Sequence, residues 1–155
     1  QHHATPLTPE ARQQIQRAFT NLTTKAREAQ CQANLRQIAS ACLMYAQAHR
    51  ETLPIADTIW KDVRVPLPLL FCKEAKTLPN GYGYNALLSG KMLQDIKDPS
   101  HTLLFADCKS ADHLIHSFDD IDQHRHANGF VAVFCDGHVE HIGTIDPAQL
   151  MLEVK

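Results

Sequence analysis

Six of the ten histidines fall between His113 and His141, so the C-terminal third of the chain is the first place to look for a metal site. Imidazole is a common ligand of zinc and other transition metals. The spacing argues against such a site, because residues three apart in a strand point to opposite faces of a sheet. His113 and His116 have that spacing, and so do His138 and His141. No three ligands follow a known zinc motif, so we predict no transition-metal site.

A hard cation needs separate consideration, because three aspartates fall in the short segment Ser117–His124. Carboxylate oxygens are ligands that calcium prefers. An acidic, solvated turn is the commoner meaning of such a composition, so the segment predicts a loop with calcium as a candidate cofactor. The candidate ligands for that ion are Asp119, Asp120 and Asp122. His124 and His126 could share one face with Asp122, so these two histidines are further candidate metal ligands.

Two side-chain pairs have residue types that could serve catalysis. Cys135 and His138 flank a turn and resemble a nucleophile beside its base, but cross-strand neighbours of this kind usually only pack. His126 and Asp136 are separated by a predicted strand, so His126 has to fold back to approach the turn. The chain has neither a serine elbow nor a Gly-rich phosphate loop. We therefore predict no catalytic residues, and we expect His126 to hydrogen-bond a backbone carbonyl of its own loop.

The residues around Asp136-Gly137 predict a β-hairpin. The runs on both sides are rich in β-branched and aromatic residues, and an Asp-Gly pair favours a two-residue type I′ turn. Gly137 accepts the positive φ that this turn requires. The turn sets Phe134 opposite Val139, so alternate residues of the two strands share one face. We expect that face, with Phe130, Phe134 and Val139, to be the core side.

A long helix is the natural cover for that face. Thr8-Pro9-Glu10 has the residues of a helix start, and no Pro or Gly follows before His49. Such a helix is about 60 Å long. Its apolar stripe changes phase midway and turns by about 200° around the axis, which indicates two different partners. We expect Ile15, Phe19 and Leu22 to face partner helices, and Leu35, Ile38, Cys42 and Tyr45 to pack on the sheet.

The remaining segments complete an α+β fold. Four prolines between residues 54 and 79 predict mostly loop, and Gly81–Asn85 reads as a turn. His101–Asp107 predicts a strand and His113–Phe118 a weaker one. The sequence thus predicts one domain, in which a long N-terminal helix packs on a small antiparallel sheet with a C-terminal hairpin. Residues 1–50 form the helix, and residues 51–155 form the globular α+β head.

Charge and hydropathy exclude some classes of partner. The formal net charge is only −2, which gives no reason to expect nucleic acid. The charge is unevenly placed, because Glu10–Arg50 carries a net +4 and residues 51–155 a net −6. No apolar run reaches the length of about 18 residues that a membrane helix needs. The chain opens QHHATPLTPE without a Met, so we expect a processed piece whose membrane segment lies upstream.

The five cysteines leave the redox compartment open. Cys31 and Cys42 share the predicted helix about 16 Å apart, which is too far for them to bridge each other. Cys72, Cys108 and Cys135 could supply one bridge, and the sequence does not select the pair.

Several segments together resemble one bacterial family. KAREAQCQANLRQIASACLMYAQAHRETLP (residues 25–54) is similar to the helix after the membrane segment in type IV pilin-like and type II secretion pseudopilin-like proteins. DPSHTLLFAD (98–107) is similar to a recurring motif of those proteins. His126, nine further residues and Asp136-Gly137 resemble the H-X9-DG motif of the prepilin-type, processing-associated family of planctomycetes and verrucomicrobia. Cys72 and GYGYN (81–85) also match, so the resemblance covers roughly residues 25–142.

This resemblance implies a pilin-like fold and a structural role. Such proteins have an N-terminal hydrophobic helix that prepilin peptidase processes, a head on the periplasmic side, and assembly into pilus-like fibres. We therefore expect a non-enzymatic pseudopilin-like subunit of a type II secretion or type IV pilus-like assembly. It would be extracytoplasmic, anchored in the inner membrane by a preceding segment, and partnered by other pilin subunits rather than nucleic acid. The chain departs from the family at Thr8–Thr23, which is polar where the family's membrane segment ends.

Two alternatives from other functional classes stay open. One is a metal-binding protein or metal-dependent enzyme that uses the histidine-rich C-terminal third. The other is an extracytoplasmic module that binds a carbohydrate or peptide through Trp60, Tyr82 and Tyr84, the aromatic residues of the central segment. Close packing of those rings would exclude the second alternative.

Overall fold

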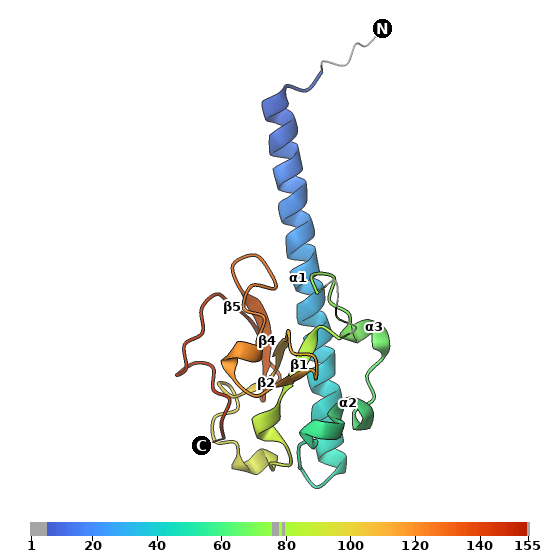
Figure 1. Ribbon diagram of the computed structural model, residues 1–155, viewed down its shortest axis with the longest axis vertical. Coiled ribbons are helices and arrows are strands. Elements are labelled where there is room, and N and C mark those ends of the chain that lie inside the picture. The colour runs from blue at the N-terminus through green and yellow to red at the C-terminus, as the bar shows by residue number, and fades with distance from the viewer. Residues whose placement is uncertain (1–5, 76–77, 79, 155) are drawn as a thin grey trace.

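The computed structural model describes residues 6–75, 78 and 80–154. A long helix, α1 (Pro9–Ala48), runs from one end of the molecule into a head that contains a five-stranded sheet (Figure 1). The predicted α+β class with a long N-terminal helix is therefore confirmed, and the arrangement is consistent with a pilin-like fold.

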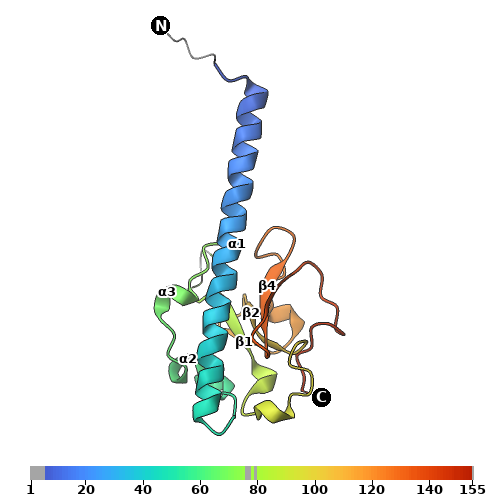
Figure 2. The same cartoon turned by 180° about the vertical axis from the view of Figure 1, so that it is seen from behind.

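The start of α1 follows from its first residues. The Oγ1 of Thr8 accepts a hydrogen bond from the backbone N–H of Ala11 at 3.1 Å, Pro9 occupies the first turn, and Glu10 places a negative charge there. The buried residues of α1 begin only at Cys31. The preceding part of the helix projects away from the head, as the two opposite views show (Figures 1 and 2).

The sheet has the strand order β3-β1-β2-β4-β5. Neighbouring strands are antiparallel except for β1 and β3, which are parallel. The predicted all-antiparallel sheet is thus wrong at one edge, because the connection after β2 carries the chain past β1 before it pairs again. The predicted turn at Gly81–Asn85 is also wrong, since most of that segment is strand β1. The strands are β1 (Tyr82–Asn85), β2 (Leu103–Asp107), β3 (Leu114–Ile115), β4 (Phe130–Phe134) and β5 (Val139–Ile142).

Short helices fill the segment between α1 and the sheet. Two of them, α2 (Ile59–Asp62) and α3 (Leu67–Leu70), lie beside the lower half of α1 (Figures 1 and 2). The 3-10 turns are η1 (Ala56–Thr58), η2 (Ala86–Leu88), η3 (Leu93–Asp95) and η4 (Phe118–Asp120).

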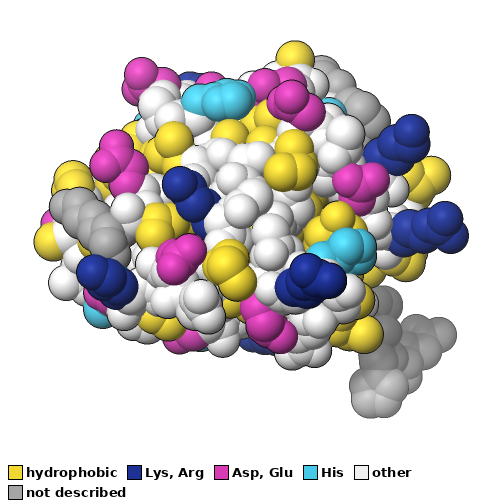
Figure 3. Space-filling view, turned by 90° about the horizontal axis from the view of Figure 1, so that it is seen from below, with side chains coloured by type: hydrophobic (Ala, Val, Ile, Leu, Met, Phe, Trp, Pro, Cys, Tyr) yellow, Lys and Arg dark blue, Asp and Glu magenta, His cyan; other side chains and the backbone are white. Residues whose placement is uncertain are grey.

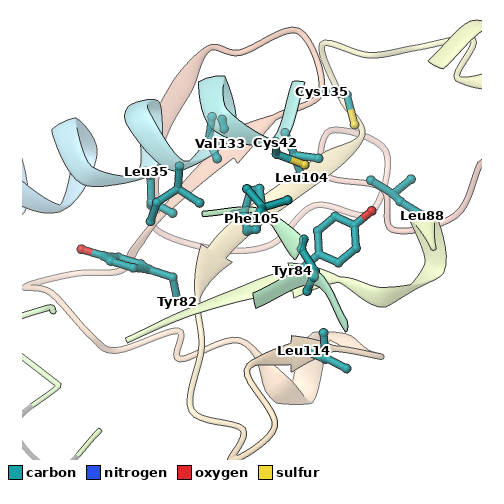
Figure 4. Close-up of a cluster of buried hydrophobic side chains, with 14 of the residues drawn as sticks. Leu35, Cys42, Tyr82, Tyr84, Leu88, Leu104, Phe105, Leu114, Val133 and Cys135 are labelled. Atoms are coloured by element: carbon teal, nitrogen blue, oxygen red, sulfur yellow. The ribbon is translucent and has the colours of Figure 1, made fainter. Parts of the chain in front are cut away.

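Both faces of the sheet are covered. The first core lies between the sheet and the second half of α1, where Leu35 and Cys42 approach Phe105 and Val133 (Figure 4). The second core lies on the opposite face, under the C-terminal segment. Its fully buried members include Leu103, Ala106, Phe130, Ala132 and Phe134.

The hairpin differs from its prediction in register and in face. Val133 pairs with Val139, and the N–H of Gly137 donates to the carbonyl of Phe134 at 2.8 Å. The loop therefore has three residues, with Gly137 at φ +90°, instead of a two-residue type I′ turn. Phe130 and Phe134 pack in the second core and do not face α1, whereas Val139 packs at the edge of the first core. All five residues of β4 are apolar and buried, so both faces of the strand look alike in the sequence. The sequence therefore does not show which face of β4 the helix covers.

The predicted packing residues of α1 lie against the sheet. Leu35, Ile38 and Cys42 are fully buried in the first core, and Tyr45 is half-buried at its margin.

The far end of the head has a mixed surface, where acidic, basic and histidine side chains are interspersed (Figure 3). That face therefore has no large area of a single charge.

Candidate functional site

The projecting half of α1 has an exposed apolar stripe. Ile15, Phe19 and Leu22 are 55%, 70% and 68% exposed, respectively. Their spacing of four and three residues places them on one side of the helix. Large apolar side chains in a row on a projecting helix are typical of a helix-binding surface. We call these three residues the stripe.

Ion pairs surround the point where α1 leaves the head. Arg27 Nη1 lies 3.0 Å from Glu74 Oε1, and Glu28 contacts Nδ1 of His141 on β5. Asn34, about two turns further into the head, donates to the hydroxyl of Tyr82 at 3.1 Å. These contacts fix the direction of the projecting half relative to the head.

A buried polar cluster lies beneath this ring of contacts. Its members come from four segments: Cys31 on α1, Cys72 after α3, Asp107 at the end of β2, and His126 before β4. One ligand atom from each lies within 4.8 Å of the others, and all four residues are buried. The two sulfur atoms are 3.0 Å apart. We call these four residues the Cys-His-Asp cluster.

Arg125 and Asp107 form the charged base of the cluster. Arg125 Nη1 lies 3.4 Å from Asp107 Oδ1, and both side chains are at most 1% exposed. Arg125 also donates to the carbonyls of Gly81 and Cys108, each at 2.7 Å, and to the carboxylate of Asp122 at 2.8 Å. Burial of a charge is tolerated only with such pairing, and here the guanidinium is fully surrounded by acceptors.

His126 lies between Asp107 and the sulfur atoms. Its Nε2 is 3.3 Å from Asp107 Oδ2, but neither ring nitrogen has a well-directed hydrogen bond. The expected bond from its ring to a backbone carbonyl is therefore wrong, because only its backbone N–H reaches a carbonyl, that of Gly129 at 2.9 Å. The segment 126–129 closes on itself through this bond, and the closure turns the ring inward.

The cluster perturbs the acidity of its members. Burial disfavours the charged imidazole, but Asp107 and Cys72 outweigh burial and raise the pKa of His126 to about 10. The neighbouring thiol of Cys31 lowers the pKa of Cys72 against the effect of burial, with further lowering by His126 and Arg125. The arrangement therefore favours a thiolate at Cys72 beside an imidazolium at His126.

Two kinds of chemistry fit this donor set. A thiolate beside a second thiol can form a disulfide. Two sulfurs, an imidazole nitrogen and a carboxylate oxygen are also the ligand types of a zinc-class ion. Among the residues that the structure describes, this is the one group of three or more such side chains close enough to share an ion.

The predicted calcium ligands do not converge. Asp120 Oδ2 accepts the backbone N–H of Ser117, the N-cap of η4, at 3.3 Å and that of His116 at 2.8 Å, and Asp122 binds Arg125. Asp119 and His124 are exposed, and His126 joins the Cys-His-Asp cluster. These five candidate metal ligands do not surround one ion, because the carboxylates of Asp120 and Asp122 are used in local caps and pairs.

Two other histidines of the C-terminal third form local pairs with acidic side chains. His116 Nε2 lies 3.2 Å from Asp112 Oδ2, and His138 contacts Asp136 and Glu140 within the hairpin. The ring of His138 stacks on Phe134 at 4.6 Å, while Cys135 is buried toward the first core. Cys135 and His138 therefore do not form a nucleophile–base pair.

The residues of the H-X9-DG motif lie in two places. His126 belongs to the buried cluster, whereas Asp136 and Gly137 form the hairpin loop. Asp136 Oδ1 accepts the backbone N–H of His138 at 3.0 Å, and Gly137 supplies the positive φ. The motif therefore contains one residue of the Cys-His-Asp cluster, before β4, and two residues of the loop after β4.

The aromatic surface proposed for ligand binding does not exist. Tyr82 and Tyr84 are 0% exposed, and the hydroxyl of Tyr84 donates to the carbonyl of Pro54 at 3.0 Å. The indole nitrogen of Trp60 donates to the carbonyl of His113 at 2.9 Å. Because both tyrosine rings are buried and the half-buried Trp60 packs against the first core, the three rings form no shared exposed surface, and the carbohydrate- or peptide-binding alternative is wrong in this form.

Comparison with known proteins gives one partial match. A family model described as "Protein of unknown function (DUF1559)" matches residues 24–59, which cover the second half of α1 and the turn after it. No significant match is found among curated proteins or among solved structures. The match and the fold are consistent with a pilin-like protein.

Among the described residues, no helix combines the length and apolar character that a bilayer crossing requires.

Proposed function

We propose that the chain is a structural subunit of a pilin-like assembly, in which the projecting half of α1 binds the same helix of neighbouring copies. One observation carries the proposal: Ile15, Phe19 and Leu22 form an apolar stripe, and each is more than half exposed. An apolar stripe on a long helix gains free energy when a second helix covers it. The match of residues 24–59 to the DUF1559 family supports the proposal, because that match is consistent with a pilin-like protein.

The proposal includes a location and a class. The head lies outside the cytoplasm, and a segment before α1 anchors the protein in the inner membrane, as the pilin resemblance implies. The role is non-enzymatic, because the proposed activity is assembly and uses no reacting group. Type II secretion pseudopilins and type IV pilins of the H-X9-DG kind are the nearest functional types. Other pilin-like subunits are the proposed partners.

The proposal is tested by charge substitution on the stripe. Full-length protein carrying Ile15→Asp and Phe19→Asp should lose most of the chemical crosslinking between copies in isolated membranes, because each carboxylate opposes burial of the stripe. The matched control carries Gln13→Asp and Thr20→Asp, which place the same charges on the opposite, exposed side of the helix. Equal crosslinking in both double variants would contradict the proposal.

A further inference from the structure

The contact between the two cluster cysteines calls for a chemical explanation. Cys31 Sγ and Cys72 Sγ are 3.0 Å apart, which is closer than two unbonded sulfur atoms pack. A disulfide brings them to about 2.05 Å. Two thiolates on one tetrahedral zinc ion move apart to about 3.8 Å, given zinc–sulfur bonds of about 2.3 Å. The distance alone therefore admits either outcome, and the surroundings must decide between them.

The surroundings favour a bond between the sulfurs. A zinc ion would need an oxygen of Asp107, but Oδ2 already accepts the N–H of Val131 at 2.8 Å, and Oδ1 faces Arg125. The carboxylate is thus used within the head. His126 and Arg125, in contrast, place positive charge beside Cys72, and such charge favours the thiolate that disulfide exchange requires.

One member of the cluster, Cys31, borders a surface hollow, although its side chain is only 2% exposed. The hollow has a volume of about 450 Å³ and lies beside the base of the projecting helix. Arg27 and Lys73 border the same hollow. A disulfide compound such as oxidised glutathione is anionic, so this border favours its approach.

We propose that Cys31 and Cys72 form a disulfide that fastens α1 to the head where the projecting half begins. Both thiols lose their hydrogen atoms and one S–S bond forms between them. The oxidant is a disulfide, whose own S–S bond breaks and takes up two electrons and two protons as two thiols. The cross-link closes a loop across 41 residues, so it also restricts the unfolded chain.

The cross-link lies where the projecting half of α1 enters the head. Cys31 is the first buried residue of α1, so force on the projecting half reaches the head at this turn. The polar contacts between helix and head around it are few: Arg27 pairs with Glu74, and Asn34 donates to the hydroxyl of Tyr82 and the carbonyl of Phe71. A covalent bond there keeps helix and head together under load. This inference goes beyond the proposed assembly role and stands without it.

The test uses the untagged chain in solution, where assembly plays no part. After incubation with oxidised glutathione at neutral pH, the intact mass should fall by the two hydrogens, and peptide mapping after alkylation should find Cys31 joined to Cys72. Reduction of the cross-linked protein should lower its melting temperature by roughly 10 °C. Cys42→Ala, at a buried cysteine on the same helix, should keep this redox-dependent shift, whereas Cys72→Ala should lose it.

Two results would overturn the inference. Free thiols at Cys31 and Cys72 after oxidation, or mixed glutathione adducts alone, would show that the pair does not close. One zinc ion per chain bound to both thiols in the purified protein would assign the cluster to a metal instead. Neither result requires a variant to fold, because both are read from the parent chain.

Discussion

At the scale of single residues, the head depends on the buried ion pair between Asp107 and Arg125. Asp107 and Arg125 come from different segments, and both are almost completely excluded from water. The pair also connects β2 with β4, because Asp107 accepts the backbone N–H of Val131. A buried charge without its partner is costly, so each member of this pair needs the other.

Asp107→Asn should therefore destabilise the protein strongly. The substitution removes the negative charge and leaves the guanidinium of Arg125 with one half-exposed carboxylate, that of Asp122. We expect the free energy of unfolding to fall by about 3–5 kcal/mol in urea titrations. Asp122→Asn, at a side chain that is 30% exposed, should cost about 1 kcal/mol or less. A larger loss for Asp122→Asn would refute this ranking.

His126 should give the reduced protein a characteristic pH dependence. Its pKa is raised to about 10 in the folded state, above its ordinary value of 6.5. The stability that the imidazolium contributes is therefore complete below about pH 6.5 and is lost as the pH rises toward 10. The difference in unfolding free energy between the parent and His126→Gln should be larger at about pH 6 than at about pH 9.5. If the loss of unfolding free energy caused by His126→Gln increased with pH instead, the charged imidazole would not stabilise the folded state.

Two glycines with positive φ should respond differently to substitution. A Cβ at Gly129 would lie 2.1 Å from the carbonyl oxygen of Ile142, whereas at Gly137 it would meet nothing within 4 Å. Gly137→Ala should cost about 1 kcal/mol for its backbone conformation alone. Gly129→Ala should cost several times more, because backbone atoms of β4 and β5 must separate. Equal melting temperatures for the two variants would argue against this packing.

At the scale of elements, α1 is one helix with two environments. Its second half covers the sheet, and its first half carries the stripe into solvent. The change of phase in its apolar pattern predicts this division, since a straight helix that buries one stripe has no reason to shift it. The hairpin was less predictable. Its strands are evident from composition, but both faces of β4 are apolar, so neither the covered face nor the loop length could be deduced.

Substitutions by alanine along α1 should distinguish its packed half from its exposed half by their effect on stability. Leu35→Ala removes a fully buried side chain from the first core and should lower the free energy of unfolding by about 2–5 kcal/mol. Ile15→Ala removes one that is 55% exposed and should change it by less than about 0.5 kcal/mol in the isolated chain. Chemical denaturation of both variants checks this, and a large loss for Ile15→Ala would mean that the stripe packs on its own head.

At the scale of the whole molecule, the Cys-His-Asp cluster could not be predicted from the sequence. Cys31 and Cys72 are 41 residues apart, and Asp107 closes a strand whose other residues are apolar. Only the folded chain brings them together with His126, since no local spacing links residues on four segments. The resemblance had singled out His126 and Cys72 without placing them together. A further signal was Asp107, a carboxylate at the end of an apolar strand, which requires a partner when it is buried.

The molecule thus has a packed head and a projecting helix whose apolar stripe is exposed. The central claim is that this stripe meets the same helix of another subunit. The most direct test places a photo-crosslinking amino acid at Phe19 in the full-length protein in cells, with Thr20 on the opposite side as the control position. We predict adducts from position 19 that map to residues 9–30 of a second copy or a similar subunit, and few from position 20. Adducts from position 19 to its own head, or equal yields at both positions, would contradict the account.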